Sequence, residues 1–142
     1  MKRVSENPTP RVKVDEPKNN TPVLIIDDEA DTCYLLKGIL RNKNIEANIV
    51  STLADAMTHL KNNDPPVIFL DNHLPDGIGM DYIKRLKQDH PTSSIIMITA
   101  YDTFPDRQRA YKEGADYFIG KPFTRDIILK TIEKIGMQKG TG

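Results

Sequence analysis

The chain has 142 residues, of which 38% are hydrophobic, and this size suits one domain with a buried core and room for an extension. Basic and acidic side chains number 20 each, so the formal net charge is zero. A balanced charge argues against direct nucleic-acid binding, which usually needs a basic excess.

No apolar run approaches the roughly 20 residues that a membrane span requires, so we expect no membrane association. The basic residues at the N-terminus are not followed by an apolar stretch, so we expect no secretory signal. The single cysteine, Cys33, allows no internal disulfide and favours a reducing, cytoplasmic location.

Residues 1–21 are expected to form a flexible N-terminal extension. The first 20, MKRVSENPTPRVKVDEPKNN, contain few hydrophobic side chains and three prolines, a composition typical of segments without a packed core. The pattern then changes, and we expect one domain over residues 22–136 and a C-terminal tail over 137–142.

Five short runs in this domain are typical of β-strands. They are PVLIIDD (22–28), EANIVS (46–51), PVIFLD (66–71), SIIMITA (94–100) and DYFIGKP (116–122). Four are rich in valine, isoleucine or leucine, and the runs are apolar on both faces, as in parallel strands that are covered by helices.

Helical periodicity separates these runs. Apolar residues recur at a spacing of three or four over residues 29–43, 52–62 and 79–90. A shorter helix is expected to begin near Phe104, and Thr124 is placed to N-cap the last one. Strands and helices alternate five times, which predicts an α/β fold with a parallel sheet and helices on both faces.

The doubly wound, flavodoxin-like arrangement of five such (βα) units has the strand order 2-1-3-4-5 and binds ligands at the carboxyl ends of the strands. Asp27 and Asp28 end the first run, Asp71 the third and Thr99 the fourth, and Lys121 follows the fifth. Strands 1, 3, 4 and 5 are neighbours in this order, so these five side chains are predicted to converge on one pocket.

Three carboxylates close together repel one another, and the pKa of one rises unless a cation cancels the charge. Mg²⁺ suits such a site because it prefers oxygen ligands and keeps positions for water and phosphate oxygens. Lys121 would place a positive charge beside a phosphate, and Thr99 a hydroxyl donor. An aspartate with these neighbours can attack phosphorus, so the pattern predicts an aspartyl phosphate.

Four motifs, LIIDDE (24–29), FLDNHLPDGIG (69–79), IMITAY (96–101) and GADYFIGKPF (114–123), occur in this order. On these motifs the chain resembles the receiver domains of two-component response regulators over about residues 22–136. The resemblance implies a cytoplasmic signalling domain that is switched by phosphorylation and is not a turnover enzyme. A histidine kinase or phosphotransfer protein would be the donor.

The resemblance also implies roles for individual residues. Asp71 would accept the phosphoryl group. Mg²⁺ would be bound by the side chains of Asp28 and Asp71 and by the backbone carbonyl of His73, with Asp27 acting through a water.

Further roles concern the phosphoryl group after transfer. Thr99 and Lys121 would contact it, and Phe118 would be the aromatic switch residue. The Lys121–Pro122 peptide bond would be cis. His73 and Tyr101, two residues past Asp71 and Thr99, would tune dephosphorylation, either by shielding the phosphoryl group or by orienting water.

Simpler interpretations exist for single residues. Asp27 and Asp28 alone would also suit a helix N-terminus, Asp71 a turn, and Lys121 the surface. A phosphatase with an aspartyl-phosphate intermediate resembles DxDxT, but His73 and Pro75 occupy its second aspartate and its threonine. A receiver that is used only for contacts would be expected to lack one of the five pocket residues.

The sequence does not show which protein or domain the switch would control. The switch would act on a downstream protein target or on a covalently linked output domain that is absent from this chain. A homodimer is also compatible with the pattern. A stand-alone receiver and one cut from a longer regulator remain alternatives.

Overall fold

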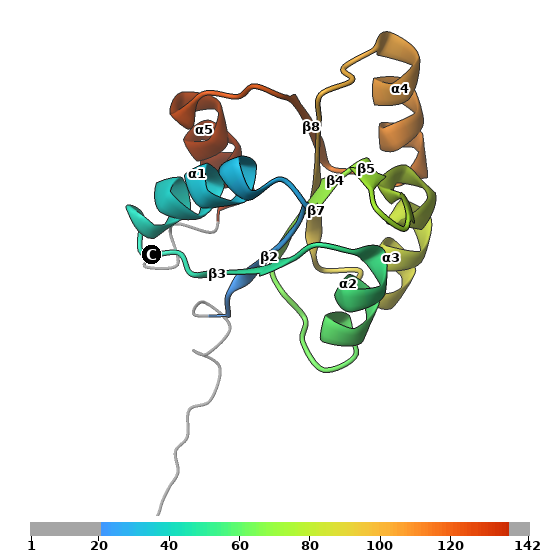
Figure 1. The fold of residues 1–142 in the computed structure, drawn as a ribbon, viewed down its shortest axis with the longest axis horizontal. Coiled ribbons are helices and arrows are strands. Elements are labelled where there is room, and N and C mark those ends of the chain that lie inside the picture. The colour runs from blue at the N-terminus through green and yellow to red at the C-terminus, as the bar shows by residue number, and fades with distance from the viewer. Residues whose placement is uncertain (1–20, 137–142) are drawn as a thin grey trace, which may run out of the picture.

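Five parallel strands form the centre of the computed structural model, which describes residues 21–136 (Figure 1). They are β2 (Val23–Ile26), β3 (Ala47–Val50), β4 (Val67–Asp71), β7 (Ser94–Thr99) and β8 (Tyr117–Gly120). Their order is β3-β2-β4-β7-β8, which confirms the predicted 2-1-3-4-5 sheet. Apart from Thr21, the expected N-terminal extension and C-terminal tail lie outside the described residues.

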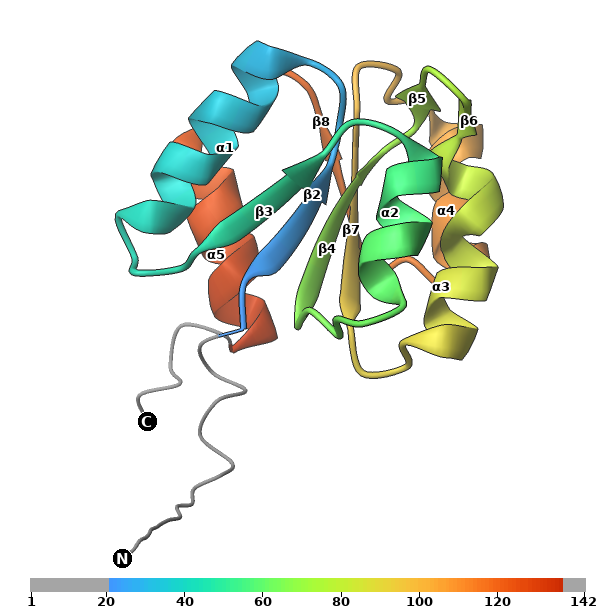
Figure 2. The same ribbon diagram turned by 60° about the horizontal axis from the view of Figure 1, so that its bottom comes forward.

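Helices cover both faces of this sheet, as predicted. They are α1 (Ala30–Arg41), α2 (Leu53–Leu60), α3 (Ile83–Asp89), α4 (Phe104–Glu113) and α5 (Arg125–Ile135). Figure 2 shows α1 and α5 on one face and the other three helices on the opposite face. Within residues 21–136, no helix is long and apolar enough to cross a bilayer.

Alternation along the strands builds two cores. Val23 and Ile25 pack toward α1 and α5, whereas Leu24 and Ile26 pack toward the other three helices. The central residues of the four strands other than β3 are therefore apolar on both faces. The prediction that all five runs are apolar on both faces is wrong for β3, where residues 48 and 49 are exposed because β3 is an edge strand.

Threonines begin three of the helices. Oγ1 of Thr52, Thr103 and Thr124 each accepts a hydrogen bond from the backbone N–H three residues on, which satisfies a donor that the first turn leaves free. This confirms the predicted cap at Thr124. The helix predicted over 79–90 is instead a 3₁₀ turn, Gly79–Tyr82, followed by α3.

The segment after β4 is held by several hydrogen bonds. It forms a two-stranded antiparallel ladder of β5 (His73–Leu74) and β6 (Gly77–Ile78), too short to leave a sequence pattern. Asn72 accepts the N–H of Gly79 at 2.8 Å through its carbonyl and that of Met80 at 2.9 Å through its side chain.

Asp76, in the turn of this ladder, is hydrogen-bonded to helix α2. Its carboxylate accepts the N–H groups of Leu53 at 2.9 Å and Ala54 at 3.0 Å, at the start of α2. These two hydrogen bonds lower the pKa of Asp76. The segment that carries the end of β4 is therefore fixed to α2 as well as to the sheet.

Gly79 and Gly38 offer a matched pair of substitutions. A Cβ at residue 79 would overlap the carbonyl oxygen of Asp71, whereas one at residue 38, in α1, would meet nothing within 4 Å. We expect Gly79→Ala to lower the free energy of unfolding by about 1–3 kcal/mol. Gly38→Ala should raise it by roughly 0.5–1 kcal/mol. Urea unfolding of both variants tests this, and equal effects would contradict the close packing at Gly79.

Candidate functional site

Five side chains meet at the carboxyl edge of the sheet. Asp27 and Asp28 follow β2, Asp71 ends β4, Thr99 ends β7 and Lys121 follows β8. Because β4 lies between β2 and β7, and β7 pairs with β8, residues far apart in sequence end on neighbouring strands. The N–H of Lys121 donates to the carbonyl of Thr99 at 2.8 Å, which extends the ladder into the site.

Asp27, Asp28 and Asp71 form an acidic cluster, in which each offers an oxygen within 4.8 Å of the others. Asp27 and Asp71 are buried. Burial, followed by the charge of Asp27, raises the pKa of Asp71 from 3.8 to about 6. Oδ2 of Asp27 is buried, and the ammonium group of Lys121 lies 3.0 Å from it. Three clustered carboxylates offer only oxygen donors and carry more negative charge than one ammonium group cancels, which fits a hard divalent cation.

The ammonium group of Lys121 lies against three carboxylates. Nζ is 3.0 Å from Oδ2 of Asp27, 3.5 Å from Oδ1 of Asp71 and 2.6 Å from Oε1 of Glu29. Burial by itself would lower the pKa of Lys121, but its contacts with Glu29 and the two aspartates outweigh burial and raise that pKa. The peptide bond between Lys121 and Pro122 is cis.

Two rings lie on the solvent side of the site. His73, on β5, and Tyr101, after β7, make a T-shaped contact with ring centroids 4.6 Å apart and planes at 61°. The N–H of Tyr101 donates to Oγ1 of Thr99 at 3.1 Å. Both rings are exposed, whereas Asp71 and Thr99 are buried. The ring pair thus links the segments that follow the two buried residues.

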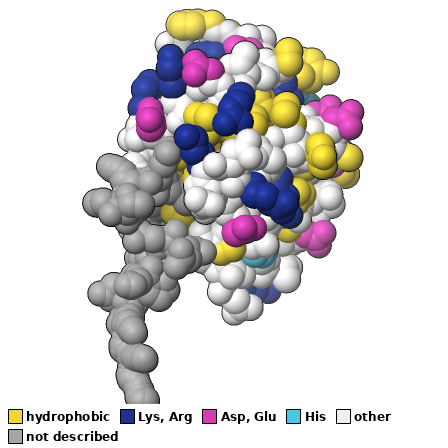
Figure 3. All heavy atoms as spheres, turned by 90° about the vertical axis from the view of Figure 1, so that its left-hand side faces the viewer, with side chains coloured by type: hydrophobic (Ala, Val, Ile, Leu, Met, Phe, Trp, Pro, Cys, Tyr) yellow, Lys and Arg dark blue, Asp and Glu magenta, His cyan; other side chains and the backbone are white. Residues whose placement is uncertain are grey.

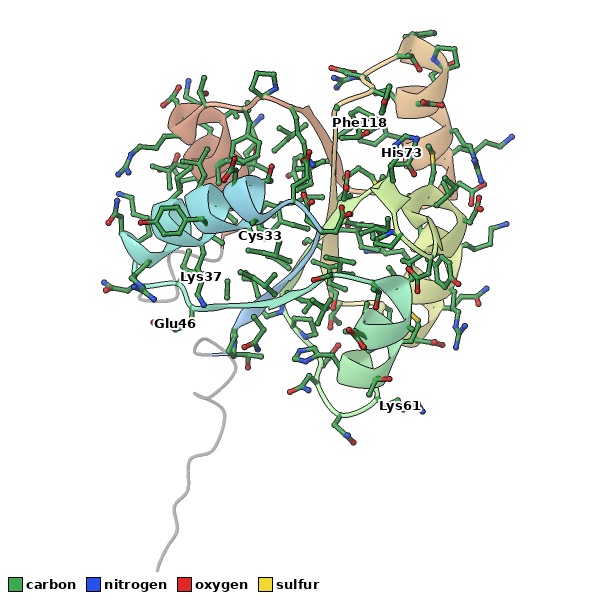
Figure 4. The ribbon with its side chains drawn as sticks, viewed as in Figure 1. Cys33, Lys37, Glu46, Lys61, His73 and Phe118 are labelled. Atoms are coloured by element: carbon green, nitrogen blue, oxygen red, sulfur yellow. The ribbon has the colours of Figure 1, made fainter. Side chains whose placement is uncertain are left out.

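Phe118 points from β8 toward α4 and is buried in the core on that face (Figure 4). The guanidinium group of Arg107, in α4, lies 4.7 Å from the centre of the Phe118 ring. Arg107 also binds both carboxylate oxygens of Asp102, at 2.8 and 2.9 Å. A Cβ at Gly120 would lie 2.8 Å from Oδ2 of Asp102, so the segment after Thr99 packs directly on β8.

The sequence did not identify four charged residues that bond to the pocket or to the segments beside it. Glu29 stands in the LIIDDE motif, but adjacency to Asp28 does not show where its side chain points. Asp102 and Arg107 are five residues apart, a spacing that does not pair side chains on one helix. Asp76 resembles an ordinary turn residue. No local signal identified their partners.

Comparison with known proteins adds to the geometry. Residues 23–133 match the family described as the response regulator receiver domain. The chain is 34% identical over 108 residues to the regulatory protein LuxO of Vibrio vulnificus (strain YJ016), which covers 76% of this chain and 24% of LuxO. It therefore spans about a quarter of the length of the curated relatives that it matches.

Solved structures agree with this match. A two-component response regulator from Clostridium difficile is 29% identical, with a TM-score of 0.77 over 81% of this chain and 94% of that chain. The beryllofluoride-activated NtrC4 receiver domain dimer is 33% identical, with a TM-score of 0.77 over 84% of this chain and 98% of that chain. Matched in sequence and in fold over most of its length, the chain belongs to the receiver domains of two-component response regulators.

Proposed function

We propose that residues 22–136 form a phosphorylation-switched receiver in which Asp71 accepts a phosphoryl group from a histidine kinase or phosphotransfer protein. The observation that carries this proposal is the buried carboxylate of Asp71 beside Lys121 and two further aspartates. An oxygen of Asp71 forms the new P–O bond, the bond from phosphorus to the donor breaks, and the electron pair leaves with the donor. Lys121 stabilises the charge that develops on the phosphoryl oxygens.

Mg²⁺ is the cofactor of this proposal. The side chains of Asp28 and Asp71 and the backbone carbonyl of His73 would hold it, and Asp27 would act through a water. When bound, the ion neutralises negative charge on the carboxylates and on the phosphoryl oxygens. The clustered carboxylates of Asp27, Asp28 and Asp71 and the raised pKa of Asp71 support a cation at this place.

The switch depends on Thr99 and Phe118. A phosphoryl group carries about two negative charges, and a charge-assisted hydrogen bond from Thr99 contributes roughly 1.5–3 kcal/mol. A switch from 1:99 to 99:1 needs about 5.5 kcal/mol, so the contacts with Lys121 and the metal ion, or else a partner, must supply the remainder. Movement of Thr99 would reach α4 through Phe118 and the Arg107 guanidinium that lies over its ring.

The chain is proposed to act as a cytoplasmic signalling partner rather than as a turnover enzyme. The output is a downstream protein or a linked domain, and a homodimer is a further alternative.

Helix α1 is the surface that we propose for a protein partner. Tyr34 and Leu35 are exposed there, beside a hollow of about 540 Å³ that also borders Arg125, on the face that Figure 3 shows with hydrophobic and basic side chains together.

Intact-protein mass tests the central step. After incubation with Mg²⁺ and acetyl phosphate, the parent should gain one phosphoryl group, and Asp71→Asn and the parent with EDTA should gain none. Asp126→Asn, which changes an exposed aspartate on α5, is the charge-matched control. A gain by Asp71→Asn would place the acceptor elsewhere. Multiple turnover on a phosphomonoester would instead indicate a phosphatase.

The pKa of Asp71 predicts a pH-dependent stability in Mg²⁺-free buffer. The value is 3.8 ordinarily and about 6 in the fold, so the folded protein holds this proton more tightly. Ionisation of Asp71 therefore lowers the free energy of unfolding. Below about pH 4 there is no loss, between pH 4 and 6 the loss grows, and above pH 6 it is complete. Asp71→Asn should be more stable than the parent above pH 6 by on the order of 1–3 kcal/mol.

Chemical denaturation across pH 4–8 measures this difference. Mg²⁺ should narrow the gap because it stabilises the parent and has less effect on Asp71→Asn. If the parent and Asp71→Asn differ by the same free energy of unfolding at pH 4 and at pH 8, the difference does not come from ionisation of Asp71.

His73 and Tyr101 are proposed to shield the aspartyl phosphate from water, because their rings lie together beside the site. Tyr101→Ala should speed hydrolysis on the order of 2- to 10-fold, the equivalent of the roughly 0.5–1.5 kcal/mol of an aromatic pair. Tyr101→Phe keeps the ring, and Tyr111→Ala removes an exposed tyrosine from α4, so both should resemble the parent. Slower hydrolysis in His73→Ala would show that His73 orients water instead.

A further inference from the structure

Glu29 makes the shortest contact with Lys121 of the three carboxylates around it. Its oxygen lies 2.6 Å from Nζ, compared with 3.0 Å for Asp27 and 3.5 Å for Asp71. The side chain of Glu29 is 59% exposed, whereas those of the two aspartates are 0% and 6% exposed. Glu29 therefore occupies the side of the ammonium group that is nearest to solvent.

The start of α1 fixes the backbone of Glu29 and leaves its side chain free for this contact. Its N–H donates to Oδ1 of Asp27 at 2.9 Å, and its carbonyl accepts from Cys33. Glu29 is the N-cap residue of α1, yet its carboxylate makes no capping hydrogen bond. Within residues 21–136, its one other side-chain hydrogen bond is accepted from the hydroxyl of Thr32 at 3.3 Å.

An ammonium group has three N–H donors, and three carboxylates already surround that of Lys121. The Asp71 contact is the longest of the three, and phosphorylation replaces that carboxylate with phosphoryl oxygens that carry about two negative charges. These oxygens can bond Lys121 more closely only in competition with Asp27 and Glu29. Asp27 is buried and cannot reach water, so its release would leave a buried charge unpaired. Glu29 is exposed, and its carboxylate can return to water at little cost.

We propose that Glu29 is an exchangeable partner of Lys121, which holds the lysine in the unphosphorylated protein and releases it when a phosphoryl group forms on Asp71. This inference rests on the proposed phosphorylation of Asp71. Glu29 also adds a fourth negative charge to the edge where an anionic donor must approach. Both effects slow phosphorylation and weaken the hold of Lys121 on the phosphoryl group.

Phosphorylation rates with acetyl phosphate and Mg²⁺ test the proposal. Glu29→Gln should be phosphorylated about 2- to 5-fold faster than the parent, the size of effect that exposed ion pairs have. The charge-matched control is Glu46→Gln, an exposed glutamate just before β3 and far from the site (Figure 4), which should keep the parent rate.

A second variant separates the contact from simple repulsion. Glu29→Asp keeps the charge, but its side chain is one methylene shorter and aspartate is a favoured N-cap residue, so its carboxylate should bind the first turn of α1 instead of Lys121. Under the proposal Glu29→Asp is also faster than the parent. A parent rate for Glu29→Asp with a faster Glu29→Gln would show repulsion alone and overturn the exchange.

Binding of beryllofluoride, a non-covalent phosphoryl analogue, gives an independent readout. Its affinity should rise in Glu29→Gln and in Glu29→Asp by a similar factor. If the parent is phosphorylated and binds beryllofluoride but the variants match it or are slower, the role of Glu29 is wrong and the proposed function stands. If the parent neither accepts a phosphoryl group nor binds the analogue, the proposed function fails, and this inference fails with it.

Discussion

Burying two like charges side by side costs free energy, and the carboxyl edge of this sheet does so with Asp27 and Asp71. The ammonium group of Lys121 offsets part of this cost, because it lies within 3.5 Å of both carboxylates. The compensation is incomplete, because the pKa of Asp71 stays raised. The proposed cation binding and phosphoryl transfer depend on this residual negative charge.

The remainder of the fold holds this unfavourable arrangement in place. Four parallel strands bring the charges together, and apolar contacts on both faces of the sheet stabilise those strands. The segment after Asp71 is fixed by the hydrogen bonds of Asn72, by the close approach at Gly79 and by the hydrogen bonds that Asp76 accepts from the start of α2. Because these contacts hold the segment that follows Asp71, a change in the charge of Asp71 acts on fixed surroundings rather than on a loose loop.

The two helical layers meet the site through different residues. On the α1 side the contact is ionic, from Glu29 to Lys121. On the α4 side it is a packed ring, with Phe118 beneath the guanidinium of Arg107 and Arg107 paired with Asp102. A phosphoryl group on Asp71 would compete for Lys121 on one side and draw Thr99 on the other, so one chemical event could reach both faces of the domain.

The sequence by itself determined the strands, the helices, their order and the five residues of the pocket. Apolar runs and helical periodicity are local properties, and parallel topology then brings the carboxyl ends of the strands together. The threonine cap at Thr124 was predictable for the same reason, because its partner is three residues away.

Only the tertiary structure decided which charges pair and which rings stack. Glu29 and Lys121 are separated by 92 residues, and Asp76 lies 23 residues from the helix end that it caps. The ladder of β5 and β6 is too short for periodicity to reveal it. These contacts depend on side-chain directions that several packed elements fix together, and no local pattern in the chain records those directions.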